Sequence, residues 1–257
     1  MSLRLCFVVP VYNHATEAAA LLERLDAFGH QVILVNDASS APQAEILRRL
    51  AADHEWVHLV EHRENGGKGA AVKTGLKEAF TRGFTHALQI DADGQHDTGD
   101  VPKLLARAQQ HPSAVIVGQP IFDDSIPRGR LIARYLTHVW VWIETLSFAI
   151  RDSMCGFRIY PLKSVVQLLR TPHLGSRMDF DPEILVRLHW KGVEVISVPT
   201  RVIYPEGGKS HFRMVEDNLL ITLMHTRLFF GMLWRAPMLL GRKLSIGRLP
   251  CQDESGK

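Results

Sequence analysis

Short apolar, β-branched runs alternate with longer segments of helical periodicity through the first 120 residues of the chain. This pattern predicts strands at 4–9, 31–36, 56–61, 86–90 and 114–118, and helices at 15–28, 42–53, 69–82 and 100–110. Such alternation is typical of βαβ units, whose strands pair in parallel and whose helices cover both faces of the sheet. We therefore expect an α/β protein with a mostly parallel central sheet.

The rhythm changes after residue 120. The pattern there predicts a polar loop at 123–130, a long apolar helix at 131–150 and a strand at 156–161. It then predicts a second helix at 182–191, another strand at 193–204 and a glycine-rich loop at 205–210. We expect one domain over residues 1–213, made of a half at 1–120 and a half at 121–213. An amphipathic, basic helical tail is predicted over residues 214–257.

Composition limits the function classes that the chain can serve. Of 257 residues, 46% are hydrophobic and 22% are charged, as in a globular protein. The net charge of +3 is too near neutral to predict a nucleic-acid partner. The three cysteines lack C-x-x-C spacing, so no zinc site or disulfide framework is indicated. The first apolar stretch is too short for a signal peptide, so we expect a cytoplasmic protein.

Residues 91–96 read Asp-Ala-Asp-Gly-Gln-His and follow the predicted strand at 86–90. Alternation in a strand would place the carboxylates of Asp91 and Asp93 on one face, where they repel unless a cation lies between them. Hard oxygen ligands suit Mg²⁺ or Mn²⁺ bridging to phosphates. A plain acidic turn remains the alternative interpretation.

Residues 65–69 read Asn-Gly-Gly-Lys-Gly and precede a predicted helix. Backbone N–H groups and the Lys68 ammonium at a helix N-terminus favour an anion such as a phosphate. The spacing does not match a Walker loop or the G-x-G-x-x-G of dinucleotide folds. A glycine turn with a solvated lysine is the alternative.

Polar residues also end the first two predicted strands. Residues 10–13 read Pro-Val-Tyr-Asn, and Asn36 and Asp37 end the second strand. In parallel sheets, ligands bind beyond the carboxyl ends of the strands, so these side chains are candidates to hold a base and a ribose. Alone, each group is explained equally well by turn formation.

Together and in this order, the four loops resemble those of the family 2 glycosyltransferases, which have the GT-A nucleotide-sugar fold. Ser153-Met154-Cys155-Gly156-Phe157-Arg158 and Phe180-Asp181-Pro182-Glu183 look most like the branch of polyprenyl-phosphate sugar synthases that includes the dolichol-phosphate mannose synthases. The resemblance covers about residues 4–210. Two departures are Val-Asn-Asp at the second strand end and Cys155 in place of a serine.

The resemblance implies a role for each matching residue. Asp37 would contact the base, Asp91 the nucleotide sugar, and Asp93 with Gln95 the metal, which Asp91 would share. Arg158 would face the phosphates or the acceptor, as would Glu183. The full set implied to bind the nucleotide sugar is Pro10, Tyr12, Asn13, Asp37, Lys68, Asp91, Ala92 and Asp93.

Transfer of a glycosyl group to a hydroxyl needs a base, and a cation stabilises the leaving diphosphate. Asp181 matches the family's F-D-x-E position best and is the first candidate for the base, with Asp179 the second. A phosphate acceptor would need no strong base. The alternative is that Asp181 caps the helix predicted to start at Pro182.

Two basic segments complete the prediction. Lys209, His211 and Arg213 follow a glycine-rich turn and would suit a lid over a diphosphate, or belong to a surface turn. Residues 218–250 contain five basic and no acidic residues around an apolar helix. That helix would either pack on the domain or lie peripherally on the cytoplasmic face of a membrane.

The sequence thus favours a metal-dependent, inverting glycosyltransferase that moves a sugar from a nucleotide diphosphate-sugar to a lipid-linked or other hydrophobic acceptor. Two alternatives stay open. One is a nucleotidyltransferase of similar architecture, which would release pyrophosphate. The other is a non-catalytic, membrane-associated scaffold that binds a nucleotide without turnover.

Overall fold

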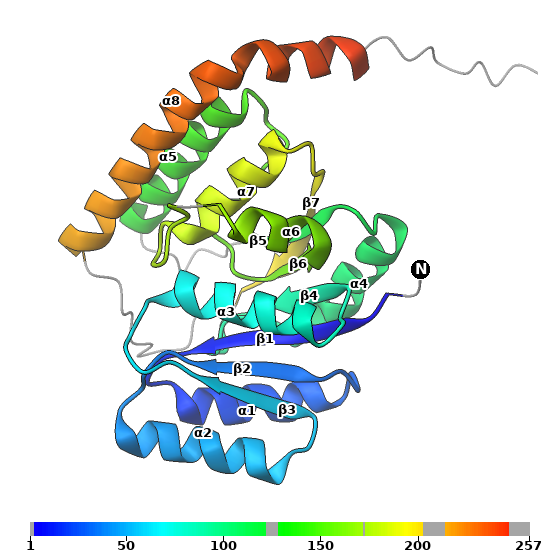
Figure 1. The fold of residues 1–257 in the computed structure, drawn as a ribbon, viewed down its shortest axis with the longest axis vertical. Helices are drawn as coiled ribbons and strands as arrows, with labels where there is room; N and C mark the ends of the chain where they lie inside the picture. The colour runs from blue at the N-terminus through cyan, green and yellow to red at the C-terminus, as the bar shows by residue number, and fades with distance from the viewer. Residues whose placement is uncertain (1–2, 122–127, 172, 203–213, 247–257) are drawn as a thin grey trace, which may run out of the picture.

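A computed structural model describes residues 3–121, 128–171, 173–202 and 214–246 (Figure 1). Its strands are β1 (Leu5–Val11), β2 (Val32–Asn36), β3 (Val57–Glu61), β4 (His86–Gln89), β5 (Val115–Ile121), β6 (Arg158–Pro161) and β7 (Val195–Arg201). Its helices are α1 (Ala15–Asp26), α2 (Ala41–Asp53), α3 (Lys68–Thr81), α4 (Val101–Gln110), α5 (Arg128–Thr145), α6 (Leu162–Leu169), α7 (Phe180–Trp190) and α8 (Met214–Ile246).

The strands form one sheet in the order β3-β2-β1-β4-β6-β5-β7. Strands β3, β2, β1 and β4 pair in parallel, as do β5 and β7. Among the strands of the described residues, β6 alone runs against its neighbours, since it pairs antiparallel with both β4 and β5. The expectation of a mostly parallel sheet is therefore confirmed.

Both faces of the sheet are covered, and strand alternation divides the core between them. In β1, Phe7 and Val9 enter one apolar cluster with residues of α1 and α4, whereas Cys6 and Val8 enter another with residues of α3, α6 and α7. Every residue of β1 is buried. An apolar run buried on both sides is what a central strand under two helical layers requires.

Helices α5 and α8 lie side by side at one end of the molecule (Figure 1). The α8 helix buries Met224, Leu228 and Met232 in the domain's core. A polar link joins the same elements, because His225 Nδ1 lies 2.7 Å from Glu144 Oε1. The predicted tail therefore packs on the domain along one face. Within the described residues, no helix is both long enough and apolar enough to cross a membrane.

The second half of the chain differs from expectation in its details. Helix α6 was not predicted, because it follows β6 without an intervening turn residue, although Leu162, Val165 and Leu169 give it a buried face. Helix α5 covers 128–145 rather than 131–150. Helix α7 begins at Phe180, two residues before the predicted start. That last difference bears directly on the site.

Candidate active site

The predicted polar loops meet beyond the carboxyl ends of β1, β2 and β4. Pro10 is buried within β1, and Tyr12 and Asn13 follow directly. The loops after β1 and β2 are tied together, because Asn13 N donates to Ser39 Oγ at 2.9 Å and Ser40 N donates to Asn13 Oδ1 at 2.8 Å. Asn13 has φ +56°, an uncommon conformation that these bonds hold in place. The two strand ends therefore form one rigid edge.

The Asp37 carboxylate holds the glycine-rich loop. Gly66 N and Gly67 N donate to its two oxygens at 2.9 and 2.8 Å, and His62 Nδ1 lies 2.7 Å from Oδ1. Gly67 has φ +90°, a region that favours glycine. The Asp37 side chain is 3% exposed. Its contact with a base stays a prediction, and its observed role is to position the loop that carries Lys68.

Lys68, the first residue of α3, bridges two carboxylates. Its Nζ lies 2.7 Å from Asp91 Oδ2 and 2.9 Å from Asp181 Oδ2. Burial lowers the pKa of Lys68, but the charges of Asp181 and Asp91 outweigh burial and raise it above its usual value. Burial raises the pKa of Asp91, but Lys68 outweighs it and holds that pKa below its usual range. Lys68 and Asp91 are therefore both charged at neutral pH.

The turn after β4 carries the remaining predicted metal ligands. Strand β4 ends at Gln89, so a turn rather than strand alternation places Asp91 and Asp93. This corrects the expectation that a strand aligns them. Asp93 Oδ1 accepts a hydrogen bond from Gln95 N at 3.0 Å, and Ala92 is buried. Burial and the neighbouring charge of Asp91 raise the pKa of Asp93.

The donor set at this turn suits a divalent cation that arrives with a phosphate ligand. Among the described residues there is no group of three or more His, Cys, Asp or Glu that could hold an ion by itself. Asp91 Oδ1 and Asp181 Oδ1 are, however, buried without a hydrogen-bond partner in the described part of the chain. Mg²⁺ commonly binds through one or two carboxylates plus substrate phosphates, so an incomplete protein set fits such an ion.

The start of α7 separates three carboxylates that the sequence grouped together. The capping interpretation of Asp181 is wrong, because α7 begins at Phe180 and Asp179 holds the N-cap position without a side-chain capping bond. Asp179 instead accepts a hydrogen bond from Arg177 N at 3.0 Å. Glu183 is fully buried and accepts from Gly175 N and Arg187 Nε. Of the three, Asp181 is the one joined to Lys68.

Arg158 does not face the phosphates or the acceptor in this structure. It is fully buried, and its guanidinium donates to the backbone oxygens of Cys155, Ser153 and Asp181. Its Nη1 also lies 3.7 Å from Asp181 Oδ1. Because each nitrogen of its buried guanidinium donates a hydrogen bond within the fold, Arg158 orients the Asp181 segment rather than a ligand. Glu183 is likewise too buried to meet an acceptor directly.

The loop 151–157 packs against the candidate site. Asp152 accepts from Cys155 N at 2.8 Å and forms an ion pair with Arg134 at 2.6 Å. The loop brings Gly156 so close to Asp91 that a Cβ added there would lie 2.5 Å from Asp91 Oδ2. Burial raises the pKa of the Cys155 thiol to about 12, so this cysteine is no nucleophile at neutral pH.

Sequence reasoning missed some residues of the site, and some predicted residues lie outside the described part of the chain. His62 lies outside the predicted motifs, and His96 ends the string at 91–96 but was given no role. His96 Nε2 lies 3.9 Å from Asp91 Oδ2, and its ring stacks on Phe157. Only the folded contacts reveal them. Lys209, His211 and Arg213 lie outside the described residues.

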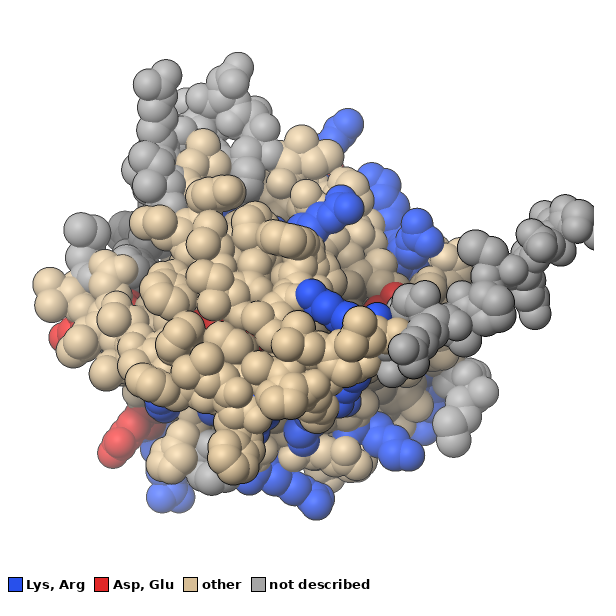
Figure 2. All heavy atoms as spheres, turned by 90° about the horizontal axis from the view of Figure 1, so that it is seen from above, with Lys and Arg blue, Asp and Glu red and all other residues tan. Residues whose placement is uncertain are grey.

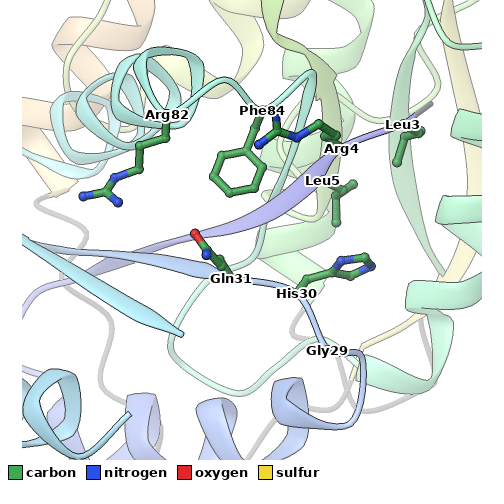
Figure 3. A pocket seen from close by; sticks show the side chains of 8 residues that line it. All are labelled: Leu3, Arg4, Leu5, Gly29, His30, Gln31, Arg82 and Phe84. Carbon is green, nitrogen blue, oxygen red and sulfur yellow. The ribbon is translucent and has the colours of Figure 1, made fainter. Parts of the chain in front are cut away.

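A hollow at the other end of the strands contains none of the predicted residues. It is lined by side chains that include Arg4, His30 and Phe84, near the amino ends of β1 and β2 (Figure 3). Ligands of parallel sheets bind at the opposite, carboxyl edge. The edge that holds Asp91 is therefore the candidate active site.

The chain is similar to solved glycosyltransferases at the level of the fold. Glucosyl-3-phosphoglycerate synthase from Mycobacterium tuberculosis, solved with Mn²⁺, UDP-glucose and phosphoglyceric acid, matches with a TM-score of 0.59 at 14% identity and covers 90% of this chain and 79% of that one. The mannosyltransferase PcManGT from Pyrobaculum calidifontis, solved with GDP-Man and Mn²⁺, matches with a TM-score of 0.55 at 16% identity and covers 96% and 76%. The GT-A expectation is confirmed.

Sequence comparison reaches the same kind of protein. Dolichyl-phosphate beta-glucosyltransferase ALG5C of Trichomonas vaginalis is 29% identical over 227 residues, which are 81% of this chain and 66% of that protein. The chain thus spans about two thirds of that relative. The model of glycosyl transferase family 2 matches residues 6–159, more than half of the chain. On this match, the chain belongs to glycosyl transferase family 2 and is a glycosyltransferase.

Proposed function

We propose that the protein is a metal-dependent, inverting glycosyltransferase that moves a sugar from a nucleotide diphosphate-sugar to a lipid-linked phosphate. The observation that carries the proposal is the meeting of Asp91 and Asp181 at Lys68, beyond the carboxyl edge of the sheet. The first carboxylate comes from the half of the fold that would hold the donor, and the second comes from the acceptor half. Family membership disfavours the nucleotidyltransferase and scaffold alternatives.

The relatives support the choice of ligands. The Trichomonas vaginalis protein is named for a dolichyl-phosphate acceptor. Both solved glycosyltransferases hold Mn²⁺ together with a nucleotide sugar. We carry these ligand classes to this chain as part of the proposal and leave the nucleotide base open, because one of the two donors is a UDP-sugar and the other is a GDP-sugar.

The residues divide the work as follows. Asp91 and Asp93, with Gln95, would hold Mg²⁺ or Mn²⁺, which stabilises the negative charge that develops on the leaving diphosphate. The Lys68 ammonium would bind the phosphates. The N–H groups of Gly66, Gly67 and Ala70 donate within the fold. Asp181 would orient the acceptor and take its proton if the acceptor is a hydroxyl. An ionised phosphate acceptor would leave Asp181 only the orienting role.

Donor binding is tested first by thermal unfolding with UDP, GDP, CDP and TDP and their sugars, each with Mn²⁺ and with EDTA. A ligand at a hundred times its dissociation constant adds about 2.7 kcal/mol of stability, which should raise Tm by about 5–10 °C for a chain of this length. We expect a metal-dependent shift with one base. No shift with any of them would contradict the donor assignment.

Turnover is tested with the selected donor and a short-chain polyprenyl phosphate. Release of the nucleoside diphosphate, rather than pyrophosphate, would support glycosyl transfer. Asp93→Asn should abolish metal-dependent transfer while the protein stays folded. Full activity in that variant, or in EDTA, would contradict the metal assignment.

We further propose that the outer face of α5 and α8 contacts the membrane that carries the acceptor. Large apolar side chains are exposed on these helices and just after α5, with Trp234 87% and Phe148 77% exposed. Other exposed apolar side chains of α5 and α8 are Tyr135, Leu136, Trp140, Leu219, Leu223, Phe230, Leu233, Leu240 and Leu244. In Figure 2, which views the molecule from above, a broad area carries few charged side chains, and Lys and Arg lie mainly to its right and below it.

The basic residues of α8 contribute less to this contact than the sequence suggested. Arg242 donates to Trp190 O, Lys243 donates to Leu146 O, and the Arg235 guanidinium lies 4.6 Å from the Trp190 ring. These bonds hold α8 on the domain. The contact with lipid would therefore depend on the aromatic and aliphatic side chains that point outward.

Liposome flotation tests this contact without deleting α8, whose buried face belongs to the core. The double variant Phe230→Ser, Trp234→Ser should lower partitioning into phosphatidylglycerol-containing vesicles about tenfold, equal to about 1.4 kcal/mol. Phe80→Ser removes an exposed aromatic ring from α3 and serves as the control. Equal partitioning of both variants and the unaltered protein would contradict the proposal, and a concentration-dependent dimer would assign the face to a second copy.

A further inference from the structure

The Lys68 ammonium occupies the place where a metal would draw on the same carboxylates. It contacts Asp91 Oδ2 and Asp181 Oδ2 at 2.7 and 2.9 Å. The other oxygen of each carboxylate, Oδ1, has no hydrogen-bond partner in the described structure. Each acid therefore offers one oxygen to Lys68. The other oxygen of Asp181 lies 3.7 Å from Arg158 Nη1, whereas that of Asp91 is one that a second cation could use.

Hydrogen bonds and close packing hold the backbone around Lys68, so a rearrangement at the site would involve chiefly its side chain. Ala70 N donates to Ser176 O at 2.9 Å, which ties the first turn of α3 to the segment before α7. A Cβ added at Gly69 would lie 2.4 Å from Phe180 Cβ, which shows how closely α3 and α7 approach. Asp37 fixes the preceding loop through Gly66 N and Gly67 N. The four rotatable bonds of the lysine stem are the soft part of this arrangement.

The charges explain why a cation must reside here before any ligand binds. Asp91 and Asp181 are largely buried, and Asp93 adds a third carboxylate beside Asp91. Buried carboxylates that share a site disfavour each other's ionised form unless a positive group lies between them. Lys68 supplies that group. A divalent ion that enters alone has to compete with an ammonium already paired to both acids.

We propose that Lys68 is a resident cation which holds Asp91 and Asp181 in the donor-free enzyme and passes to the donor diphosphate when a metal–nucleotide complex binds. The move would release Asp91 to the metal and Asp181 to the acceptor. Metal alone would then bind weakly, and the site would accept the metal chiefly together with a diphosphate. This inference rests on the proposed function and adds a rule for the order of binding.

The test measures Mn²⁺ affinity without nucleotide, from the free-ion signal in electron paramagnetic resonance. Lys68→Met keeps most of the side-chain volume and removes the ammonium. We expect it to bind Mn²⁺ alone about tenfold more tightly than the unaltered protein, because the carboxylates lose their competing partner. The same variant should bind Mn²⁺ with UDP or GDP about tenfold more weakly, because the diphosphate loses a cation.

Two further variants separate a specific contact from a general change in charge. Lys77→Met removes one positive charge from an exposed position of the same helix and should leave Mn²⁺ affinity within about twofold. The double variant Lys68→Met, Asp181→Asn restores the net charge and relieves repulsion if the single variant fails to fold. It too should bind Mn²⁺ alone more tightly than the unaltered protein. Unchanged or weaker Mn²⁺ binding in both Lys68 variants would overturn the inference.

The inference and the proposed function fail in different measurements. If the unaltered protein binds no Mn²⁺–nucleotide complex but Lys68→Met gains Mn²⁺ affinity, the resident cation stands and the donor assignment falls. If the unaltered protein binds the complex but Lys68→Met shows no gain with Mn²⁺ alone, the donor assignment stands and the resident cation falls.

Discussion

The carboxyl ends of β2 and β4 carry the same chemical group and use it in opposite ways. At the end of β2, both oxygens of Asp37 accept hydrogen bonds from backbone N–H groups, and His62 lies against one of them. At the end of β4, Asp91 gives one oxygen to Lys68 and keeps the other buried without a hydrogen-bond partner in the described chain. Both oxygens of Asp37 therefore have hydrogen-bond partners, whereas one oxygen of Asp91 has none among the described residues.

The difference teaches how to separate scaffold from reaction centre at one sheet edge. A buried polar group without its hydrogen bonds destabilises the fold, so it persists chiefly where function requires it. Asp37 uses both of its oxygens within the fold and positions the loop that presents Lys68. Asp91 keeps one oxygen without a hydrogen-bond partner among the described residues, and a lysine side chain rather than backbone N–H groups holds Asp91 and Asp181. This contrast predicts that substitutions at the two ends will move different quantities.

The largest expected effect is on turnover at the β4 end. Asp91→Asn should lower kcat/KM about a thousandfold, equal to about 4 kcal/mol of transition-state stabilisation, because the metal and the donor lose a charged ligand. Its Tm should stay close to that of the unaltered protein, because Lys68 retains its ion pair with Asp181. Asp53→Asn, at the exposed end of α2, is the control. Full turnover in Asp91→Asn would remove the β4 end from the reaction.

The next effect is on stability at the β2 end. Asp37→Ala leaves the N–H groups of Gly66 and Gly67 without their acceptor. It should lower the free energy of unfolding, measured in urea, by about 3 kcal/mol. Asp37→Asn keeps one accepting oxygen and should lose less. If Asp37→Ala is as stable as the unaltered protein and changes only the preferred nucleotide base, Asp37 contacts the base and its structural role is wrong.

At the carboxyl end of β2, sequence reasoning predicted where the strand ends but not that Asp37 holds the glycine-rich loop. The strand at 57–61 was expected at 56–61, and the strand at 32–36 was expected at 31–36, because apolar runs between turn residues mark them directly. Whether a carboxylate at a strand end is satisfied depends on which backbone groups fold over it. The pairing of Lys68 with Asp181 joins positions far apart in the chain and leaves no local pattern to detect.

The second half of the chain shows the same limit in another form. Arg158 was expected to face a phosphate because arginine in a motif favours anions, yet the loop 151–157 folds around it and supplies carbonyl oxygens instead. Helix α6 was missed since it starts without a turn signal after β6. Local chemistry predicted the residue types at the site, and tertiary packing decided which of them a ligand meets.

Asp152 is a second carboxylate that acts, like Asp37, on stability, and its substitution should have an intermediate effect. Burial raises the pKa of Asp152, but the hydrogen bond to His138 and the charge of Arg134 outweigh burial and lower it to about 2. Because the folded-state pKa lies below the unfolded value, ionised Asp152 stabilises the fold above about pH 4, by about 2 kcal/mol. Asp152→Asn should lose that amount.

The pH dependence provides the check on Asp152. The stability difference between the unaltered protein and Asp152→Asn should be constant from neutral pH down to about pH 4 and shrink as the pH falls toward 2. Urea unfolding at a series of pH values measures it. A difference that does not change with pH would mean that the loop depends on the shape of Asp152 and not on its charge.

The smallest expected effect has the opposite sign and belongs to Asp93. Burial and the charge of Asp91 raise the pKa of Asp93 in the folded state, so the fold loses stability as the pH rises through that pKa and Asp93 ionises. Asp93→Asn removes the charge and should raise Tm at neutral pH, with a smaller gain at about pH 4, where the unaltered carboxyl is partly protonated. Turnover should fall in the same variant. A site that gains stability when it loses function holds its charge for a ligand. A lower Tm in Asp93→Asn would instead place Asp93 with Asp37 among the structural carboxylates.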